Sequence, residues 1–486
     1  LVTGIMGAKA DSVPLVAVTG QVARAALGTE AFQECDICSI AASCTKKTFM
    51  VMSAEDLAPT IREAFQTAQE GRPGPVLVDV PRDVQLEVVE AMFPEVNAIP
   101  APEVPSGTRD KLQAAARLIN EAERPVIISG HGIQTSGAYA ELLALAENTR
   151  IPVITTLLGL SGFPSGHPLS LGMLGMHGMY WANIAVDQAD LIVGVGMRFD
   201  DRVTGKVSTF APHARIVHID IDPNQIGRNV TVEVPLPGDA KAVLQSLVPL
   251  VSYKARPQWM QFIDGLRRDH PSLAVPPSDK LQTQHVLANL NEILQEDEGS
   301  LVVTGVGQHQ MWAAQFLSFN RQNTFVSSGG LGAMGFELPA ALGMQAGRPA
   351  ATVWSIAGDG GFQMTLQELV TAAEEKLPVK IALINNGHLG MVRQWQEMYF
   401  ENHLKAVPVP GPDYLKLAEA YGVEAVRVSE QEDVLPALRQ AKAHDGPFLI
   451  EFVVDQSTNV YPMVPPGGSL ADTIEDPAVV KGAPSP

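Results

Sequence analysis

The sequence predicts an α/β protein in which each domain has a mainly parallel sheet flanked by helices. Short apolar segments that resemble buried strands alternate with helical segments along most of the 486 residues. Glycine-rich turns follow several of these strands, as is typical where a parallel strand leads into a helix. Proline-rich and polar stretches divide the alternation into three parts, which agrees with domains of about 150 residues.

Composition excludes several functional classes. The net charge of −19 argues against nucleic acid or an anionic membrane as the main partner. No apolar run reaches the ~18 residues that a membrane span needs. Three cysteines without a zinc-ligand pattern around them indicate a reducing compartment, and we expect them to be small buried residues.

The first segment, residues 1–93, has strand-like stretches at Val13 to Thr19 and Gly74 to Val80. It begins without methionine inside a helical pattern, so we expect an α/β domain that is incomplete at its N-terminus. Prolines between Pro94 and Pro105 predict an extended connector.

The second segment, residues 107–251, repeats a strand-then-helix pattern and ends in a helical stretch at 238–251. Its expected strands are Pro125 to Ser129, Ile151 to Thr156, Leu191 to Gly196 and Arg215 to Asp220. The polar, proline-containing residues 252–280 predict a second linker.

The third segment, residues 281–455, opens with an amphipathic helix at Thr283 to Gln295. The further elements expected in it are strands at Ser300 to Thr304, Ala351 to Ala357 and Pro378 to Ile384, and helices at Met311 to Phe316 and Gln363 to Lys376. A C-terminal tail, residues 456–486, is rich in proline and glycine, so we expect it to lie over the surface or an active site.

A carboxylate and an amide follow two consecutive strands of the third segment. Asp359 lies in Gly358-Asp359-Gly360-Gly361, and Asn386 follows the next strand. In a right-handed βαβ unit both residues lie at one sheet edge, where oxygen ligands suit Mg²⁺ and glycines let phosphates approach. The alternative is an ordinary glycine turn in which Asp359 caps the next helix. The matched Asn386 favours the metal-diphosphate site, and the pattern is similar to the thiamine diphosphate (ThDP) signature.

Two further glycine loops open helices in the same segment. The loop at 305–310 follows a strand, and its N–H groups suit phosphate oxygens. In the loop at 328–335, Met334 between glycines is either core filler or an apolar wedge against a bent cofactor, with the Gly332 carbonyl facing an amine.

The middle segment carries a charged loop after its third strand. Arg198, Asp200 and Arg202 suit the phosphates and ribose of a dinucleotide, although a solvated salt-bridge loop is the alternative. Asp220 ends the next strand, where ribose-binding acids commonly occur. Gly130-His131-Gly132 is a weaker glycine turn after the first strand.

Together these segments resemble the catalytic large subunit of acetolactate synthase, over essentially the whole chain. The motifs that carry the resemblance include 28–34, 71–76, 172–178, 330–339, 198–202, 307–315 and 391–395, of which the last three are the most specific. The resemblance implies a three-domain ThDP-enzyme architecture: a pyrimidine-binding domain at 1–93, an FAD-binding domain at 107–251 and a diphosphate-binding domain at 281–455.

The resemblance also implies roles for individual residues. Mg²⁺ would be held by Asp359, Asn386 and the backbone oxygen of His388. Contacts to ThDP would come from Gln308, His309, Gly332, Met334, Gly358, Asp359, Gly360, Gly361, Asn386, Gly390 and Met391. Contacts to FAD would come from Arg72, Gly130, Gly132, Met176, His177, Arg198, Asp200, Arg202, Asp220 and Asp239. The substrate channel would be bordered by Phe32, Gln33, Arg82, Met391 and Trp395, with Gln33, Met334 and Trp395 nearest the chemistry.

The implied reaction is the first common step of branched-chain amino-acid biosynthesis. Pyruvate is decarboxylated on ThDP, and the remaining hydroxyethyl group is joined to pyruvate or 2-ketobutyrate. FAD has no net redox role in the family. The implied partners are further copies of the chain, in a homodimer or tetramer, and a small regulatory subunit. The implied compartment is the cytoplasm of a bacterium or an organelle of a eukaryote.

Two departures from the family qualify this expectation. The family's activating glutamate matches a position upstream of Leu1, so we expect very low activity of the 486 residues alone. The family's aspartate at position 305 is Gly305 here. Another ThDP-dependent carboligase or decarboxylase, or a catalytically silent cofactor-binding protein, remains the alternative function.

Overall fold

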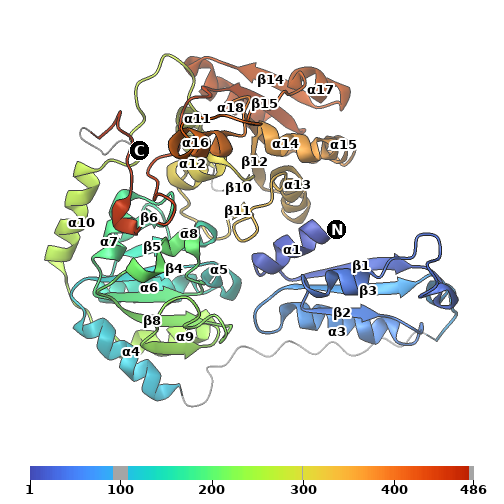
Figure 1. Cartoon of the computed structure of the whole chain (residues 1–486), viewed down its shortest axis with the longest axis horizontal. Coiled ribbons are helices and arrows are strands. Elements are labelled where there is room, and N and C mark those ends of the chain that lie inside the picture. The colour runs from blue at the N-terminus through green and yellow to red at the C-terminus, as the bar shows by residue number, and fades with distance from the viewer. Residues whose placement is uncertain (91–107, 298, 481–486) are drawn as a thin grey trace. The chain divides into compact units, whose positions relative to one another are not determined.

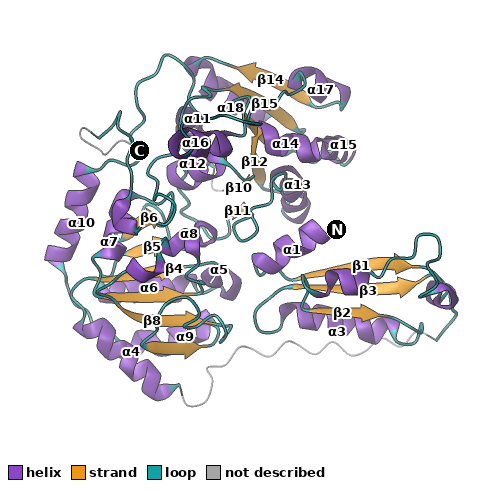
Figure 2. Cartoon of the chain, in the orientation of Figure 1, coloured by secondary structure: helices purple, strands orange, loops and turns teal. Residues whose placement is uncertain are grey.

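The computed structural model describes residues 1–90, 108–297 and 299–480. Among these, residues 1–90 and 328–333 form one compact unit, and residues 108–327 and 334–480 form a second. The described residues form three wholly parallel sheets flanked by helices, which confirms the predicted α/β class (Figures 1 and 2). The expected connector between Pro94 and Pro105 lies outside the described residues.

The first unit contains a three-stranded sheet. Strand β3 (Pro75–Pro81) pairs in parallel with β1 (Leu15–Gln21) on one side and β2 (Lys47–Met50) on the other. Every residue of β3 is buried, as expected of a central strand covered on both faces. Strand β2 escaped prediction because it is short and half polar. The helices of this unit are α1 (Val2–Ala10), α2 (Ile37–Ala42) and α3 (Leu57–Gln69).

The central sheet lies in the second unit and has the strand order β6-β5-β4-β7-β8-β9. Its strands are β4 (Pro125–Ser129), β5 (Val153–Thr155), β6 (Ser170–Met173), β7 (Leu191–Val195), β8 (Arg215–Asp220) and β9 (Val234–Pro237). The chain leaves β4 toward β5 and β6 on one side, and it continues from β7 to β8 and β9 on the other. The crevice beyond the carboxyl ends of β4 and β7 is therefore a topological switch point, where α/β proteins bind ligands.

Helices cover both faces of the central sheet. They are α4 (Arg109–Glu121), α5 (Gly132–Ser136), α6 (Tyr139–Thr149), α7 (Tyr180–Asp187), α8 (Asp201–Thr204) and α9 (Ala240–Leu247). Alternate residues of β4 supply the two cores. Ile127 packs with α4, α6 and α9, whereas Val126 and Ile128 pack with α7 on the opposite face. This alternation is the period-2 pattern of a strand buried on both faces.

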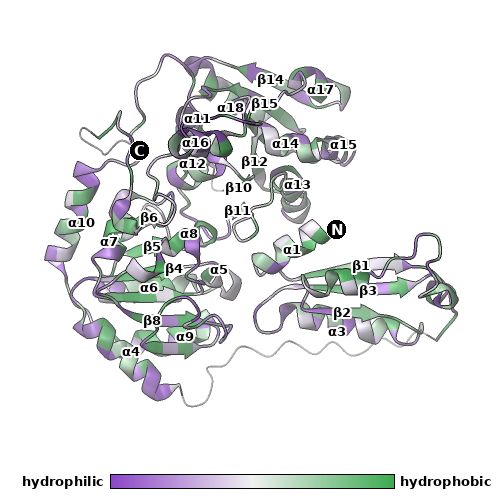
Figure 3. Cartoon of the chain, in the orientation of Figure 1, coloured by the Kyte–Doolittle hydropathy of each residue, from purple (hydrophilic) through white to green (hydrophobic). Residues whose placement is uncertain are grey.

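The prediction of a polar linker at 252–280 is wrong, because these residues contain helix α10 (Pro257–Asp269). Pro257 occupies the first helical turn, where a missing N–H costs nothing. Trp259 and Ile263, one helical turn apart, are buried against the central sheet, and Trp259 donates a 3.1 Å hydrogen bond to the carbonyl of Pro125. Figure 3 shows hydrophilic colours along much of α10, which hides this narrow apolar stripe in the sequence.

The third sheet, also in the second unit, has the order β11-β10-β12-β13-β15-β14. Its strands are β10 (Ser300–Thr304), β11 (Phe325–Ser327), β12 (Thr352–Gly358), β13 (Lys380–Asn385), β14 (Glu424–Val428) and β15 (Phe448–Val453). The chain runs from β10 to β11 at one edge and then crosses to β12. This places a second switch point between the carboxyl ends of β10 and β12.

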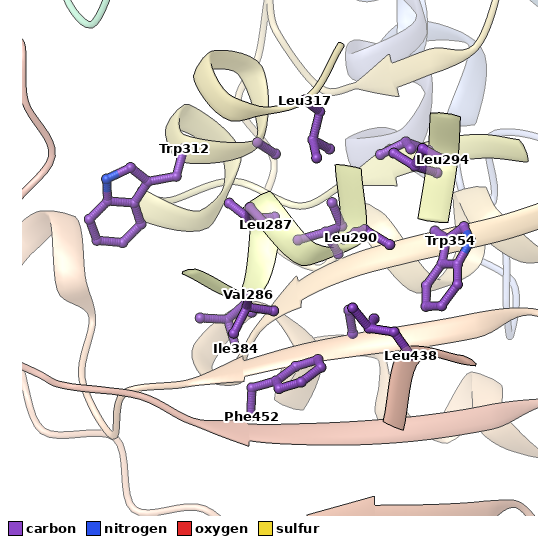
Figure 4. Close-up of a cluster of buried hydrophobic side chains, with 14 of the residues drawn as sticks. Val286, Leu287, Leu290, Leu294, Trp312, Leu317, Trp354, Ile384, Leu438 and Phe452 are labelled. Carbon is purple, nitrogen blue, oxygen red and sulfur yellow. The ribbon is translucent and has the colours of Figure 1, made fainter. Parts of the chain in front are cut away.

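The helices around the third sheet are α11 (Thr283–Glu296), α12 (Gln308–Phe316), α13 (Glu337–Gly347), α14 (Asp359–Thr365), α15 (Leu369–Glu374), α16 (Gly390–Tyr399), α17 (Tyr414–Ala420) and α18 (Val434–Ala443). One face of the sheet packs against α11, α12 and α18, and Figure 4 shows Leu290 of α11 and Leu438 of α18 in this core with Trp354 of β12. The other face packs against α13, α15 and α17.

Two helices begin earlier than predicted. The segment expected as one helix at Gln363 to Lys376 starts at Asp359 and is split by a 3₁₀ turn at Leu366–Glu368. Helix α12 starts at Gln308, three residues before the expected Met311. In both cases the glycine loop leads directly into the helix, so its first N–H groups lie next to the loop.

The tail and the cysteines complete the fold. In the described part of the tail, Val460, Met463 and Val464 are buried, so the tail packs into the second unit. Cys44 is buried, but Cys35 is exposed, which corrects the expectation of three buried thiols. Within the described ranges, no helix has the length and hydrophobicity of a membrane span.

Candidate functional site

The pair Asp359 and Asn386 lies at the carboxyl ends of two adjacent parallel strands, as the sequence predicts. Gly358, the last residue of β12, pairs with Ile384 of β13, so the residues that follow share one edge of the sheet. The carboxylate Oδ1 of Asp359 accepts a 3.0 Å hydrogen bond from the N–H of Gly360. The amide Oδ1 of Asn386 accepts a 3.0 Å hydrogen bond from the N–H of His388.

The second carboxylate oxygen of Asp359 has no hydrogen-bond partner among the described residues, although it is buried. Burial raises the pKa of this carboxyl to about 6. A buried acceptor without a donor is costly, and a cation would satisfy it. One carboxylate, one amide oxygen and one backbone carbonyl are hard ligands of the kind that Mg²⁺ takes, so these residues fit the metal.

Glycine is required where the loop after β13 meets α12. A Cβ atom on Gly390 would lie 2.0 Å from Oε1 of Gln308 and 2.7 Å from Nδ2 of Asn386. A Cβ atom on Gly360 would lie 2.8 Å from the side chain of Leu389 and 3.5 Å from the methyl group of Met334. The loops therefore approach one another as closely as glycine allows, and this brings Gln308, Met334, Gly360 and Asn386 together.

Gln308 is fixed by a buried amide network that joins α12 to α16 and the tail. Its Nε2 donates to Oε1 of Gln394 at 3.0 Å and to the carbonyl of Thr458 at 3.2 Å. Gln394, fully buried, also donates to the carbonyl of Val460 and accepts from its N–H. The neighbouring Arg393 donates to the carbonyls of Gln456 and Ser457. Residues 456–460 of the tail thus pack over this edge of the third sheet.

His309 is buried beside the same loops. Burial lowers the pKa of its imidazole to about 4, so the ring is neutral at pH 7. Its Nε2 has no hydrogen-bond partner in the described part of the chain, and a Cβ on Gly358 would lie 2.7 Å from the ring. A neutral imidazole can donate one N–H to a phosphate oxygen without adding a buried charge.

Met391 and Trp395 lie on α16 beyond the loop. Met391 packs against the core on one face of the third sheet, and the half-buried Trp395 makes an edge-to-face contact with Tyr399 at 5.6 Å between ring centroids. Gly332 belongs to the first unit with residues 328–333, so its role toward the other loops stays a prediction.

The glycines after β4 have a structural reason. A Cβ on Gly130 would lie 2.2 Å from the carbonyl oxygen of Gly196, and one on Gly132 would lie 2.5 Å from the Cα of Gly196. The loops after β4 and β7 touch through backbone atoms at the switch point. This contact accounts for both glycines.

Met176 and His177 lie against the charged loop and the tail. The N–H of Met176 donates to the carbonyl of Arg202 at 2.8 Å, and the N–H of Val464 donates to the carbonyl of Met176 at 2.7 Å. His177 is buried with its Nδ1 3.2 Å from the carbonyl of Pro462, and burial lowers its pKa to about 4. The structure therefore brings Met176, His177 and Arg202 together.

The predicted acidic contacts of the middle segment have local partners. Asp200 caps α8 and lies 3.1 Å from the Arg198 guanidinium, while Arg202 is largely exposed. Asp239 caps α9 by accepting from the N–H of Ala242, which is a sufficient structural role for this carboxylate. Asp220 at the end of β8 accepts from the N–H of Asp222 at 2.8 Å.

Besides Gly332, four predicted site residues lie in the first unit. Phe32 is 90% exposed, and Gln33 next to it has a positive φ of 66°. Arg72 donates to the hydroxyl of Ser12 at 2.9 Å, and the N–H of Arg82 donates to the carbonyl of Gln21 at 3.0 Å. Their relation to the residues of the second unit stays a prediction.

Sequence reasoning assigned no role to three of the buried polar residues near the third sheet: Gln394, Glu451 and Glu337. The sequence does carry a signal for the buried position of Glu451, because this residue is the one charge in the otherwise apolar strand Phe448–Val453. Glu337 had a similar signal, since it stands between Phe336 and Leu338 in an apolar stretch.

Comparison with known proteins gives two family matches. Residues 305–452 match the thiamine pyrophosphate enzyme C-terminal TPP binding domain, and residues 112–247 match the thiamine pyrophosphate enzyme central domain. The chain is 46% identical to the acetolactate synthase large subunit of Corynebacterium glutamicum, covering 97% of the chain and 77% of the relative. It is 44% identical to acetolactate synthase of Mycobacterium leprae (96% and 77%) and 42% identical to acetolactate synthase isozyme 2 large subunit of Escherichia coli (98% and 85%).

Proposed function

The chain belongs to the acetolactate synthase large-subunit family of ThDP enzymes, and from this we propose how its residues carry out the family's reaction. The reaction releases CO₂ from pyruvate and joins the remaining two-carbon unit to a second 2-keto acid. ThDP, when bound, supplies the electron sink for the decarboxylation.

The observation that carries the proposal is the edge formed by β12 and β13. Asp359, Asn386 and the His388 carbonyl would hold Mg²⁺, and the buried unpartnered oxygen of Asp359 supports this assignment. The N–H groups that begin α12 and α14, with neutral His309 and Gln308, would hold the diphosphate.

The remaining ThDP and substrate contacts follow from the same loops. Met334, beside Gly360, would press on the cofactor as an apolar wedge, with Gly332, Gly358, Gly361, Gly390 and Met391 around it. Trp395 would shape the pocket for the second 2-keto acid, and Phe32, Gln33 and Arg82 would border the access route.

FAD would bind at the switch point between β4 and β7. Gly130, Gly132 and the loop of Arg198 and Arg202 lie at or follow the strand ends there, and the partly exposed guanidinium groups suit phosphate. Met176, His177 and Asp220 would contact the rest of FAD, and Arg72 from the first unit would complete the set. Asp239 is a weaker candidate because it already caps α9.

We also propose a homodimer or tetramer of the chain. A small regulatory subunit is proposed as well, and the large-subunit names of two relatives support this second partner. The test of function is product analysis: the purified chain is incubated with pyruvate, ThDP, Mg²⁺ and FAD. Acetolactate, formed without oxygen consumption, supports the proposal. Acetaldehyde or acetate as the sole product would assign a different ThDP reaction.

The expected low activity is tested separately. The 486-residue chain is compared with one lengthened by the residues that precede the matching position in the Corynebacterium relative, where we expect the activating glutamate. We predict much faster acetolactate formation by the longer chain, and equal rates would refute this expectation.

A further inference from the structure

Glu337 is an unpaired carboxyl at the second switch point. It is the first residue of α13, its side chain is fully buried, and neither carboxylate oxygen has a hydrogen-bond partner among the described residues. A Cβ on Gly305, just after β10, would lie 2.3 Å from its Oε2, and one on Gly361, after β12, would lie 2.7 Å from its Oε1. The carboxyl therefore fills the space that these two glycines leave between the loops.

Among the described residues, the elements that pack most closely against α13 carry no cationic side chain near Glu337. The elements packed against α13 are β10, β12, α14 and the turn Leu366–Glu368, and their ionisable residues are Asp359 and Glu368. On α12, His309 is neutral at pH 7. An ionised carboxylate in such surroundings is costly. Burial accordingly raises the pKa of Glu337 to about 7, and only the nearby N–H groups of Glu337 and Gly335 oppose this rise.

Glu337 lies between the loops that follow β10 and β12, and the N–H groups at the starts of α12 and α14, which these loops open, would hold the proposed diphosphate. A diphosphate held there would bring its negative charge close to Glu337. Repulsion between the two disfavours the ionised carboxyl, and the neutral acid can donate an O–H hydrogen bond.

We propose that Glu337 is a positioning residue of the diphosphate site that takes up a proton when the diphosphate of ThDP binds. The inference rests on the proposed function, because it takes ThDP as the ligand. The proton comes from solvent and forms the O–H bond of the neutral acid, and no other bond changes. The affinity for ThDP then falls as pH rises above 7, up to tenfold per pH unit.

The test is isothermal titration calorimetry of ThDP into the chain with saturating Mg²⁺ at pH 8. Running it in two buffers of different ionisation enthalpy gives the number of protons taken up. Asp359, with a pKa of about 6, is already ionised at this pH and adds none. We expect the wild-type chain to take up close to one proton more than Glu337→Gln, whose dissociation constant should change little with pH.

A charge-relocation variant separates this role from simple filling of space. Because a Cβ at position 305 would lie 2.6 Å from the Glu337 carboxyl carbon, Gly305→Asp combined with Glu337→Gly returns a carboxyl to the same space. Proton uptake should be absent in Glu337→Gly and return in the double variant. Glu475→Gln, at another buried carboxyl, should keep the wild-type uptake.

The outcomes are distinguishable. Equal proton uptake by the wild type, Glu337→Gln and Glu337→Gly, with ThDP bound, overturns this inference and leaves the proposed function intact. Failure of the folded wild-type chain to bind ThDP at all overturns the proposed function itself. Circular dichroism establishes which variants are folded, and the double variant supplies the answer if Glu337→Gln is not.

Discussion

The amide Nδ2 of Asn385 donates a 2.8 Å hydrogen bond to Oε1 of Glu451, a buried carboxylate on the neighbouring strand. Arg427 binds the other oxygen of Glu451 at 2.6 Å. The amide oxygen of Asn385 in turn accepts from the N–H of Gly387 at 3.1 Å. A chain of side-chain contacts from three adjacent strands thus holds the loop that presents Asn386 and His388.

Replacing Glu451 should weaken the binding of Mg²⁺. Glu451→Ala removes the acceptor that orients Asn385, and loss of an outer-shell partner typically costs 10- to 100-fold in metal affinity. Glu451→Gln keeps an oxygen for Asn385, so its effect should be smaller. Titration of Mg²⁺ in the presence of ThDP measures the metal affinity of both variants. Glu296→Ala, which breaks an exposed pair with Arg439, is the control and should have no effect.

Gly390→Ala should disturb the cofactor loops. Its new methyl group would lie 2.0 Å from Gln308, whose amide network gives it little room to move. We expect about 1 to 3 kcal/mol of lost stability, as for other overpacked sites, together with weaker ThDP binding. The matched control is Gly343→Ala, since a Cβ there meets nothing within 4 Å. Inside a helix that change should stabilise the protein by about 0.5 to 1 kcal/mol. Urea unfolding measures both values, and similar effects of the two substitutions would contradict the prediction.

In metal-free protein, Asp359 should make stability fall as pH rises. Its pKa is raised from 3.8 to about 6, so the folded state binds this proton more tightly than the unfolded chain. The stabilisation is complete below about pH 4 and is lost as pH rises through 6, by roughly 3 kcal/mol. Urea unfolding in the presence of a chelator should show this change in the difference between wild type and Asp359→Asn. A difference that does not vary with pH would rule out the assigned environment, and Mg²⁺ should restore stability above pH 6.

Arg202→Ala should reduce the amount of FAD that copurifies with the chain. The guanidinium is largely exposed, and its removal leaves the backbone contact with Met176 in place, so the fold should persist. Arg215→Ala, at another exposed arginine of the same domain, should retain FAD at the wild-type level. Visible absorbance of the bound flavin measures the ratio of FAD to protein in each purified variant. Equal flavin content in both variants would remove Arg202 from the proposed set.

The sequence predicted those parts of the site that local pattern determines. Asp359 and Asn386 follow apolar strands, and the adjacency of parallel strands then brings them to one edge. Helix α10 was missed because its buried face consists of only a few residues, such as Trp259 and Ile263, in a polar stretch. The contacts of Gln394 and Glu451 could not be predicted, because Gln308 lies 86 residues from Gln394 and Asn385 lies 66 residues from Glu451. Those of Glu337 could not be predicted either, because only the folded chain brings Gly305 and Gly361 near it.

The most direct test of the central claim is Mg²⁺-dependent binding of ThDP at the edge of β12 and β13. ThDP is titrated into the metal-free chain with and without Mg²⁺, for wild type and for Asp359→Asn. The account predicts tight binding only for wild type with Mg²⁺, and a dissociation constant at least about tenfold weaker for the variant. Equal binding in the presence of a chelator, or equal binding by Asp359→Asn, would contradict it.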